Sequence, residues 1–456
     1  MDPNIVIMQV SRESDPDVLT LANLYVESGL ASYAKAGMST RFVLSSEPND
    51  PYWQYQWYLN NPHAKVYDIE LDKAFDYTFP PNDVIVAILD DGFAPHEDID
   101  PQRVIDCQDY YWPWLQCLPP YGRAHGMGCL GIIAARVSNS IGVTGIASQH
   151  VRIIEQKISD VVMDSIDDFA DDEMIALAVD DAVAAGAKVI NCSWGCYDRT
   201  GGNCGQSNLQ LALELADSAG VSIVAASGNY ADYYPNYIDW PAKMPEVIAV
   251  GATKATDAYW WWSEYGEQLD VMAPSGDVYL ETADIWTLDQ MGSFGYNPDK
   301  VTCNPQNDRY NCKFGGTSAA CAEVSGIIAL LRARRTDLTV DQLRKIIRYS
   351  SDRVNYTGSF DDTARVNNYV GWGRVNADRA LMAVVRGDAD NSGDDDISDV
   401  IYLYTYIFDG GSGSATAQGG RRRELRRCGR HLGLCLPDRL HPFRRSAASN
   451  LLPLHL

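Results

Sequence analysis

Short apolar runs that are rich in β-branched residues alternate with helical segments along most of this chain. The runs lie at 84–88, 151–158, 187–192, 221–226 and 247–251. Runs of roughly four to eight such residues are typical of strands buried on both faces, as in a parallel sheet. Two intervening segments are rich in strong helix formers and end at Gly186 and Gly220, and glycine commonly ends a helix. The alternation predicts an α/β fold, with a mostly parallel sheet and helices on both faces.

Three residues that together can perform hydrolysis follow or precede these elements. Ligands bind at the carboxyl ends of parallel strands, and Asp90 closes the first apolar run. His125 and Ser318 each precede a segment that predicts a buried helix. Taken alone, a serine there is usually a helix cap and a histidine is usually structural. Together, the carboxylate, imidazole and hydroxyl can form a triad, in which the base takes the serine proton and the acid orients the base.

The motifs that carry these three residues resemble a known family. They read VAILDDGFAPHED, HGMGCLGIIAA and GGTSAACAEVSG, and together they are similar to the subtilisin-like serine peptidases. The order Asp, His, Ser along the chain agrees with that family. The resemblance implies a serine endopeptidase acting on protein or peptide substrates. In it Asp90 orients the imidazole, His125 is the general base and then the acid, and Ser318 attacks the peptide carbonyl.

Two further segments resemble substrate-binding parts of the same family. The segment VAASGNYADYYPNYIDWPAKMPEVIAVGAT resembles the one with the oxyanion asparagine, which implies that role for Asn229. The segment VINCSWG resembles the strand that pairs with an extended substrate. An ordinary turn and an ordinary core strand are the alternative interpretations of these two segments. The substrate-binding residues implied by the resemblance are Ser193, Trp194, Gly195 and Gly228.

Three positions depart from the family pattern. Asp91 follows Asp90 where Ser or Thr is usual, Met127 replaces a usual Thr, and Ala322 replaces a frequent Pro. None of these changes removes a reacting atom. A second carboxylate beside Asp90 is expected to disturb its ionisation, which leaves the pH optimum open.

The cysteines indicate an extracellular protein, and the overall charge bears on its partners. Eleven cysteines are present, and several flank polar loops in a manner that suits disulfides. The net charge of −24 argues against a nucleic-acid partner. No run of 18 apolar residues predicts a membrane span, and Met1 does not open a secretion signal, so we expect a signal to precede the sequence given. The loop pairs are Cys107 with Cys117, Cys196 with Cys204 and Cys303 with Cys312, while Cys129, Cys192 and Cys321 are expected to be buried thiols.

The N-terminal segment resembles the end of an inhibitory propeptide of the family. The resemblance covers 19–45, and the segment 48–61 then resembles the start of a mature enzyme. The sequence therefore predicts a propeptide remnant over 1–47 and a peptidase domain over 48–386.

An acidic loop follows the predicted peptidase domain. The segment DADNSGDDDISD at 388–399 places oxygen atoms at the offsets of a calcium-binding EF-hand loop, and an apolar helix follows at once. This arrangement resembles half of a dockerin module, over 387–410, and implies Ca²⁺ and a cohesin-type partner; a solvated acidic loop is the alternative. Ca²⁺ sites within the peptidase domain are left open. The predicted ligands are Asp388, Asp390, Ser392, Asp396 and Asp399 through side chains and Asp394 through its carbonyl.

The remaining residues, 411–456, combine a Gly/Ser-rich linker with an arginine-rich end. A one-nucleotide shift of this end can encode a second copy of the acidic loop, so we hypothesise a frameshift and expect a disordered tail. Two functional hypotheses remain for the whole chain. One is a secreted serine endopeptidase, and the other is a catalytically silent subtilisin-like protein that binds through the dockerin-like module.

Overall fold

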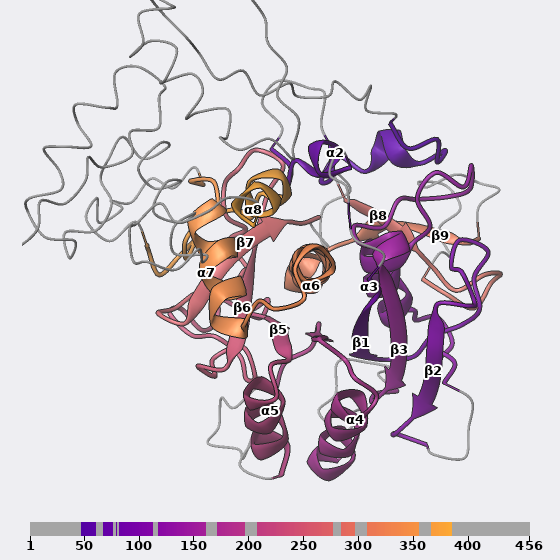
Figure 1. Ribbon diagram of the computed structural model, residues 1–456, viewed down its shortest axis with the longest axis horizontal. Helices are drawn as coiled ribbons and strands as arrows, with labels where there is room; N and C mark the ends of the chain where they lie inside the picture. The colour runs from indigo at the N-terminus through magenta and orange to yellow at the C-terminus, as the bar shows by residue number, and fades with distance from the viewer. Residues whose placement is uncertain are drawn as a thin grey trace, which may run out of the picture. The chain divides into compact units, whose positions relative to one another are not determined.

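A seven-stranded parallel sheet forms the centre of the computed structural model (Figure 1). Its order is β2-β3-β1-β4-β5-β6-β7, and each neighbouring pair runs parallel. This arrangement confirms the predicted fold class. The strands are β1 Val84–Asp90, β2 Val104–Asp109, β3 Val151–Lys157, β4 Val189–Cys192, β5 Ser222–Ala226, β6 Val247–Thr253 and β7 Leu269–Pro274.

The structure describes only part of the chain. The described residues are 47–60, 67–75, 79, 82–112, 117–160, 171–196, 208–276, 284–296, 308–354 and 366–384. The predicted propeptide remnant, the acidic loop at 388–399 and the tail therefore lie outside them, apart from residue 47.

Helices cover both faces of the sheet because successive strand residues point to opposite sides. In β1, Val86 and Ile88 belong to one hydrophobic core, whereas Ala87 and Leu89 belong to a second. The first core contains α3 and α6, and the second contains α4 and α5, which lie together at the bottom of Figure 1. These helices are α3 His125–Ala134, α4 Asp172–Ala184, α5 Asn208–Ser218 and α6 Gly316–Arg334.

Several elements have weaker sequence signals than these. Strand β2 is mostly exposed and polar, so its residues do not form an apolar run. A second sheet consists of the antiparallel pair β8 Ile285–Leu288 and β9 Tyr310–Phe314. The other helices are α2 Leu71–Ala74, α7 Val340–Ser350, α8 Ala377–Ala383 and the 3₁₀ turns η1 Trp53–Tyr55 and η2 Ser148–His150.

A buried ion-pair cluster around Asp270 fixes the amino end of the sheet. Asp270 lies near the start of β7 and is fully buried. Its Oδ1 and Oδ2 accept hydrogen bonds from Nε and Nη2 of Arg344 at 2.8 and 2.7 Å, and Arg348 also donates to it. Arg344 donates in addition to the carbonyls of Pro245 and Val247. The cluster joins α7 to the starts of β6 and β7 through permanent charges.

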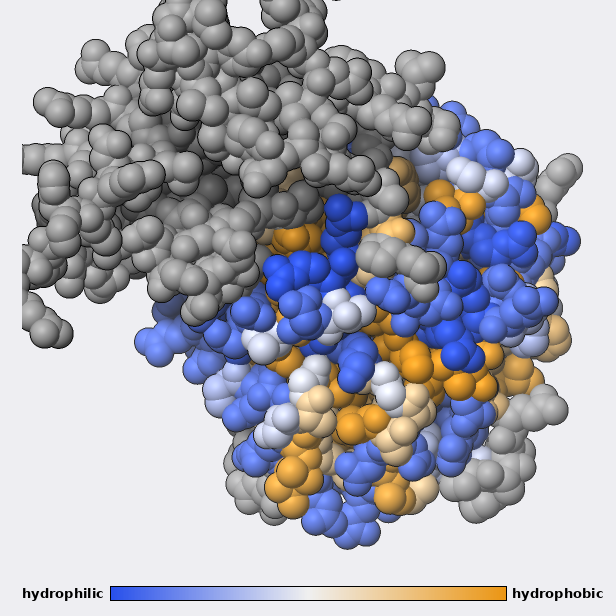
Figure 2. All heavy atoms as spheres, in the orientation of Figure 1, coloured by the Kyte–Doolittle hydropathy of each residue, from blue (hydrophilic) through white to orange (hydrophobic). Residues whose placement is uncertain are grey.

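The visible face of the molecule mixes apolar and polar side chains (Figure 2). Over α4 and α5 the exposed apolar residues include Leu177, Leu211 and Leu215, and hydrophilic groups separate the apolar ones. Across the part of the chain that the structure describes, helices fall short of the length and hydropathy needed to cross a membrane.

The disulfide pairing agrees with the prediction where both cysteines of a pair are described. Cys107 and Cys117 form a disulfide, as predicted. Cys196 and Cys312 are also disulfide-bonded, and their predicted partners lie outside the described residues. The three cysteines expected to be thiols, Cys129, Cys192 and Cys321, are free and buried.

Candidate active site

Asp90 and His125 meet at the carboxyl edge of the sheet. Asp90 is the last residue of β1, and His125 is the first residue of α3. Nδ1 of His125 lies 2.7 Å from Oδ1 of Asp90, whose side chain is 4% exposed, while 27% of the imidazole is exposed. Burial disfavours the imidazolium, but the charge of Asp90 outweighs this effect and holds the pKa of His125 well above its ordinary 6.5. The contact fixes the ring with Nδ1 toward Asp90 and Nε2 on the opposite side.

Asp91 holds the first turn of α3. Its Oδ2 accepts the N–H of His125 at 3.0 Å, and its Oδ1 accepts the N–H of Gly126 at 2.8 Å. The first N–H groups of a helix have no partner within the helix, and a carboxylate there also favours the helix dipole. Burial, and next the charge of Asp90, raise the pKa of Asp91 to about 6. Asp91, at the position where Ser or Thr is usual, therefore caps α3 from outside the helix and positions His125.

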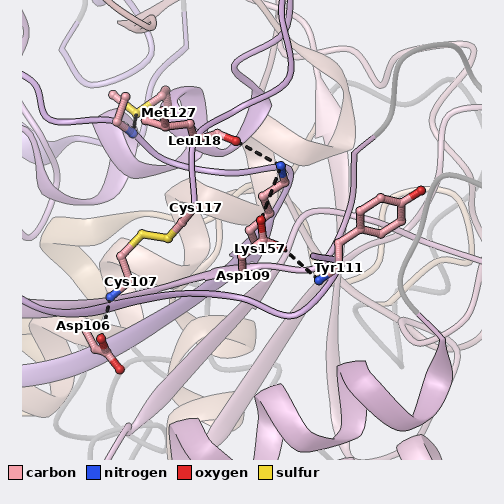
Figure 3. Close-up of a disulfide and its surroundings, with 9 residues drawn as sticks. Asp106, Cys107, Asp109, Tyr111, Cys117, Leu118, Met127 and Lys157 are labelled. Carbon is pink, nitrogen blue, oxygen red and sulfur yellow. Dashed lines mark hydrogen bonds and ion pairs between the residues drawn. A yellow bond between two sulfur atoms is a disulfide. The ribbon is translucent and has the colours of Figure 1, made fainter. Parts of the chain in front are cut away.

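The segment that leads into α3 is tied to the sheet from two sides (Figure 3). The disulfide joins Cys117 to β2, and the carbonyl of Cys117 accepts the N–H of Phe93 at 2.7 Å. The carbonyl of Leu118 accepts a hydrogen bond from Nζ of Lys157, the last residue of β3, at 3.0 Å. Met127 is fully buried in α3, and its sulfur accepts the N–H of Ala94. Met127 thus has a packing role.

Ser318 lies in the first turn of α6, at the same edge of the sheet as Asp90. It is the third residue of the helix and 8% exposed, so its N–H is one of the four without an intrahelical acceptor. Its hydroxyl donates to the carbonyl of Ser193 at 3.0 Å, and the hydroxyl of Ser193 donates back to the carbonyl of Ser318. Ser193 directly follows β4, and β4 pairs with β1, the strand of Asp90. The two serines therefore lock the start of α6 onto the strand beside Asp90.

Two contacts connect the surroundings of Ser318 with those of His125. Phe314, four residues before Ser318, packs its ring 5.2 Å from that of His125. Cys129, one turn after His125, interacts with Ser193, to which Ser318 is bonded. Helices α3 and α6 also pack against each other. The structure thus places Ser318 at the same sheet edge as the Asp90–His125 pair, with the hydroxyl of Ser318 bonded to Ser193.

Asn229 is held in a fixed orientation beside the start of α6. Its Oδ1 accepts the N–H and the hydroxyl of Thr317 at 2.9 and 3.0 Å. Within the described ranges, Nδ2 donates to no protein acceptor. Gly316 adopts a φ of +73°, and a Cβ on it would lie 3.4 Å from the Asn229 amide. The amide and the N–H of Ser318 are therefore two donors in the same neighbourhood.

The four predicted substrate-binding residues lie in two segments, each with one contact to the start of α6. Ser193 contacts it directly, and Trp194 and Gly195 follow in a half-buried segment after β4. Gly228 follows β5, the neighbour of β4, and its N–H donates to the hydroxyl of Thr317 at 3.2 Å. Two adjacent strands thus end on either side of the start of α6.

One group of three metal-ligating side chains lies close together among the residues that the structure describes. It consists of Asp90, His125 and Cys129. A thiol and an imidazole are soft ligands, whereas Ca²⁺ takes six to eight oxygen atoms, about 2.3–2.6 Å away. This group therefore does not fit Ca²⁺, and the predicted calcium loop lies outside the described residues.

Sequence reasoning missed two supporting residues. Asp91 was expected to perturb the ionisation of Asp90, and its capping of α3 was not predicted. Thr317 was not singled out, although it orients Asn229 and contacts Gly228. No local pattern reports such contacts, because each joins residues more than 30 positions apart.

Comparison with known proteins agrees with this architecture. The model of the subtilase family matches residues 81–373, a span that includes Asp90, His125, Asn229 and Ser318. The chain belongs to the subtilase family.

Two curated relatives illustrate the extent of the similarity. Thermitase of Thermoactinomyces vulgaris is 29% identical over 324 residues, which cover 71% of this chain and 98% of thermitase. A calcium-dependent protease of Nostoc sp. is 28% identical over 319 residues, covering 65% of this chain. The match spans 46% of the Nostoc protein, so it concerns about half of that relative.

A solved structure supports the fold. The serine protease of Aeromonas sobria superposes with a TM-score of 0.64 at 21% identity. The superposition covers 77% of this chain and 71% of that protein.

Proposed function

We propose that this chain is a serine endopeptidase in which Asp90, His125 and Ser318 form the catalytic triad. The observation that carries the proposal is the 2.7 Å contact between His125 and the buried Asp90, at the sheet edge where Ser318 lies in the first turn of α6. A buried carboxylate beside an imidazole and a serine at a helix start are the parts that acyl transfer needs. Membership of the subtilase family supports the same assignment.

The chemistry follows from the residues present. On arrival of a peptide, the Ser318 hydroxyl leaves the carbonyl of Ser193 and turns to Nε2 of His125. His125 takes its proton as Ser318 Oγ attacks the peptide carbonyl carbon, and Asp90 stabilises the imidazolium that forms. His125 then returns the proton to the leaving amine. Water attacks the acyl-enzyme through the same base and frees Ser318.

The oxygen of the tetrahedral intermediate needs donors that are already oriented. Nδ2 of Asn229 and the N–H of Ser318 supply them. Thr317 keeps the asparagine amide from turning, because both its N–H and its hydroxyl bind Oδ1. The donors thus require no rearrangement when charge develops on the oxygen.

The most direct test compares the purified protein with Ser318→Ala in the hydrolysis of casein. We expect wild-type protein to cleave casein, and the variant to retain its fold but to cleave at the background rate. Equal activity of the two proteins would contradict the proposal. Binding of casein without cleavage by wild-type protein would instead support the alternative of a silent binding protein.

The protein is proposed to be secreted and to bind Ca²⁺. The Cys107–Cys117 disulfide supports an oxidising compartment. The oxygen spacing of residues 388–399 supports calcium binding there, and a relative is named a calcium-dependent protease. Calorimetric titration of EDTA-treated protein with Ca²⁺ tests this part. We expect Asp388→Ala to remove one binding event, and an unchanged isotherm would contradict the assignment.

A further inference from the structure

We propose that a cavity at the amino end of the sheet binds a short peptide with free termini, its carboxylate at Arg332 and its ammonium group at Asp217 and Glu246. The cavity lies at the opposite edge of the sheet from the candidate active site. Its volume is about 660 Å³, within the range of roughly 300–1,000 Å³ that small-molecule sites occupy. The charges on its walls define the ligand.

The cavity is formed at the starts of three neighbouring strands, β4, β5 and β6 (Figure 1). Lys188 directly precedes β4, Gly220 lies two residues before β5, and Glu246 directly precedes β6. The end of α5 and the connection from α6 to α7 supply the other walls. All the segments that line the cavity are among the described residues.

Arg332 is a buried cation in the last turn of α6, and it lines the cavity. Its side chain belongs to a residue that is 4% exposed. Nη2 donates to the carbonyl of Gly220 at 2.7 Å and to the hydroxyl of Ser222 at 3.0 Å, and Nη1 donates to the carbonyl of Leu338 at 3.4 Å. Nε has no acceptor among the described residues. Burial lowers the pKa of Arg332 to about 10.

The partners of Arg332 do not neutralise it. Carbonyl and hydroxyl oxygens, and the carboxyl end of a helix, offer only partial negative charge, whereas a guanidinium carries a full positive charge. Within the described ranges, Arg332 has no carboxylate partner, and a buried charge without a counter-ion is costly. A carboxylate that enters the cavity would supply the full charge that is missing.

Asp217 and Glu246 form the acidic side of the same cavity. Burial, and next the charge of Glu246, raise the pKa of Asp217, although Arg344 opposes this effect. The guanidinium of Arg344 is itself bonded to Asp270. In the part of the chain that the structure describes, neither Asp217 nor Glu246 has an ion-pair partner. An ammonium group beside these two carboxylates would relieve their repulsion.

One turn joins the basic and the acidic side. The N–H of Gly220 donates to the carbonyl of Asp217 at 2.8 Å, and the carbonyl of Gly220 accepts the bond from Arg332. A ligand with a single charge would meet a wall of its own sign, whereas a zwitterion matches both walls. The size of the cavity favours a short peptide over a single amino acid. Such peptides are also what the proposed activity releases, but the charges alone define the ligand.

Calorimetric titration of the full chain with L-alanyl-L-alanine tests the proposal. A Ser318→Ala background removes the proposed hydrolysis, so binding is measured whether or not the protein is a peptidase. We expect saturable binding of one dipeptide per chain. The N-acetyl dipeptide lacks the ammonium group and the dipeptide amide lacks the carboxylate. Each should bind more weakly by about tenfold or more, the loss expected for one charge-assisted contact.

Two variants assign the contacts to the cavity. Arg332→Met keeps the length of the side chain and should weaken binding of the dipeptide by about tenfold or more. Glu246→Gln, at a half-buried position, should weaken binding of the dipeptide but not of its N-acetyl form. Asp337→Asn is the matched control, because Asp337 lines the same cavity but is bonded to Arg335 at 2.7 Å. This control should leave the affinity unchanged.

Several outcomes would overturn the proposal. They are the lack of saturable binding, equal affinity for the dipeptide and its two blocked forms, and binding that Arg332→Met leaves intact, which would place the dipeptide elsewhere. Free alanine that binds as tightly as the dipeptide would also overturn it, in favour of an amino-acid site. If Arg332→Met fails to fold, the blocked dipeptides and Glu246→Gln still decide. None of these outcomes bears on casein cleavage, which tests the proposed function separately.

Discussion

Buried carboxylates lie at both ends of the parallel sheet, but their partners differ. At the amino end, Asp270 is bonded to Arg344 and Arg348, whose charges are permanent. At the carboxyl end, Asp90 is paired with His125, whose charge can change with pH. A permanent pair can only hold the structure, whereas a titratable pair can move a proton. The first end should therefore govern stability, and the second should govern catalysis.

The largest expected effect belongs to the carboxyl end. Asp90→Asn keeps the size of the side chain but removes the charge that orients and stabilises the imidazolium. We expect kcat to fall by about 10⁴-fold, the loss known for this change in a serine-protease triad. The denaturation midpoint should change little. A kcat within tenfold of wild type would contradict the role assigned to Asp90.

The corresponding change at the amino end should affect folding instead. Asp270→Asn leaves two partly buried arginines with a neutral partner, and breaking a buried pair costs at most about 3–5 kcal/mol. Urea denaturation should show a loss of that size, with kcat of the folded protein unchanged.

Asp341→Asn is the matched control, in α7, the helix that carries Arg344 and Arg348. Asp341 pairs with Lys345 in an exposed i,i+4 bridge, which contributes about 0.3–0.5 kcal/mol. If Asp270→Asn were no more destabilising than this control, the proposed distinction between the two ends would be wrong.

Asn229→Ala tests the oxyanion donor at the carboxyl end. Loss of one such donor costs about 10²–10³ in kcat, a magnitude established for subtilisin, a member of this family. We expect that loss with little change in KM, because the donor acts on the transition state. Steady-state kinetics of both proteins on one peptide substrate measures kcat and KM separately. A change confined to KM would indicate a role in substrate binding only.

Glu323 is a third kind of buried carboxylate and allows a further test. It lies within α6, between the two ends of the sheet. Both of its oxygens are buried and have no hydrogen-bond partner among the residues described. Burial raises the pKa of Glu323 well above its ordinary 4.5. The folded state then keeps a proton that the unfolded state releases, so the free energy of unfolding falls as pH rises above about 4.5.

Glu323→Leu should remove this dependence. We expect the variant to be more stable than wild type by about 1–3 kcal/mol at pH 8, the cost of an unsatisfied buried polar group. The difference between the two proteins should shrink toward pH 4. Denaturant titrations across this range measure it, and parallel pH profiles would show that Glu323 has an acceptor or a cation nearby.

The sequence predicted the elements whose burial leaves a clear apolar pattern along the chain. The apolar runs ending at Asp90 and beginning at Val247 became β1 and β6, because strands buried on both faces carry continuous apolar sequence. Strand β2 lies at one edge of the sheet, carries three consecutive exposed residues at 106–108 and was missed. The same reasoning found the start of α6 from the apolar segment after Ser318.

The reacting residues of the candidate site were predicted from motifs, but the contacts that orient them were not. Each motif places one reacting group at the end of a strand or the start of a helix. The contacts that orient them join distant segments, such as Asp91 with Gly126 and Asp270 with Arg344.

The central claim is that His125, held by Asp90, activates Ser318. The most direct test is the rate at which a fluorophosphonate labels the protein as a function of pH, with the modified residue identified by peptide mass spectrometry. Neutral imidazole is required, and the pKa of His125 lies above 6.5. The account therefore predicts an adduct on Ser318 whose rate of formation rises with pH to a midpoint above 6.5 and is lost in His125→Ala. An adduct elsewhere, or a rate that His125→Ala leaves unchanged, would contradict it.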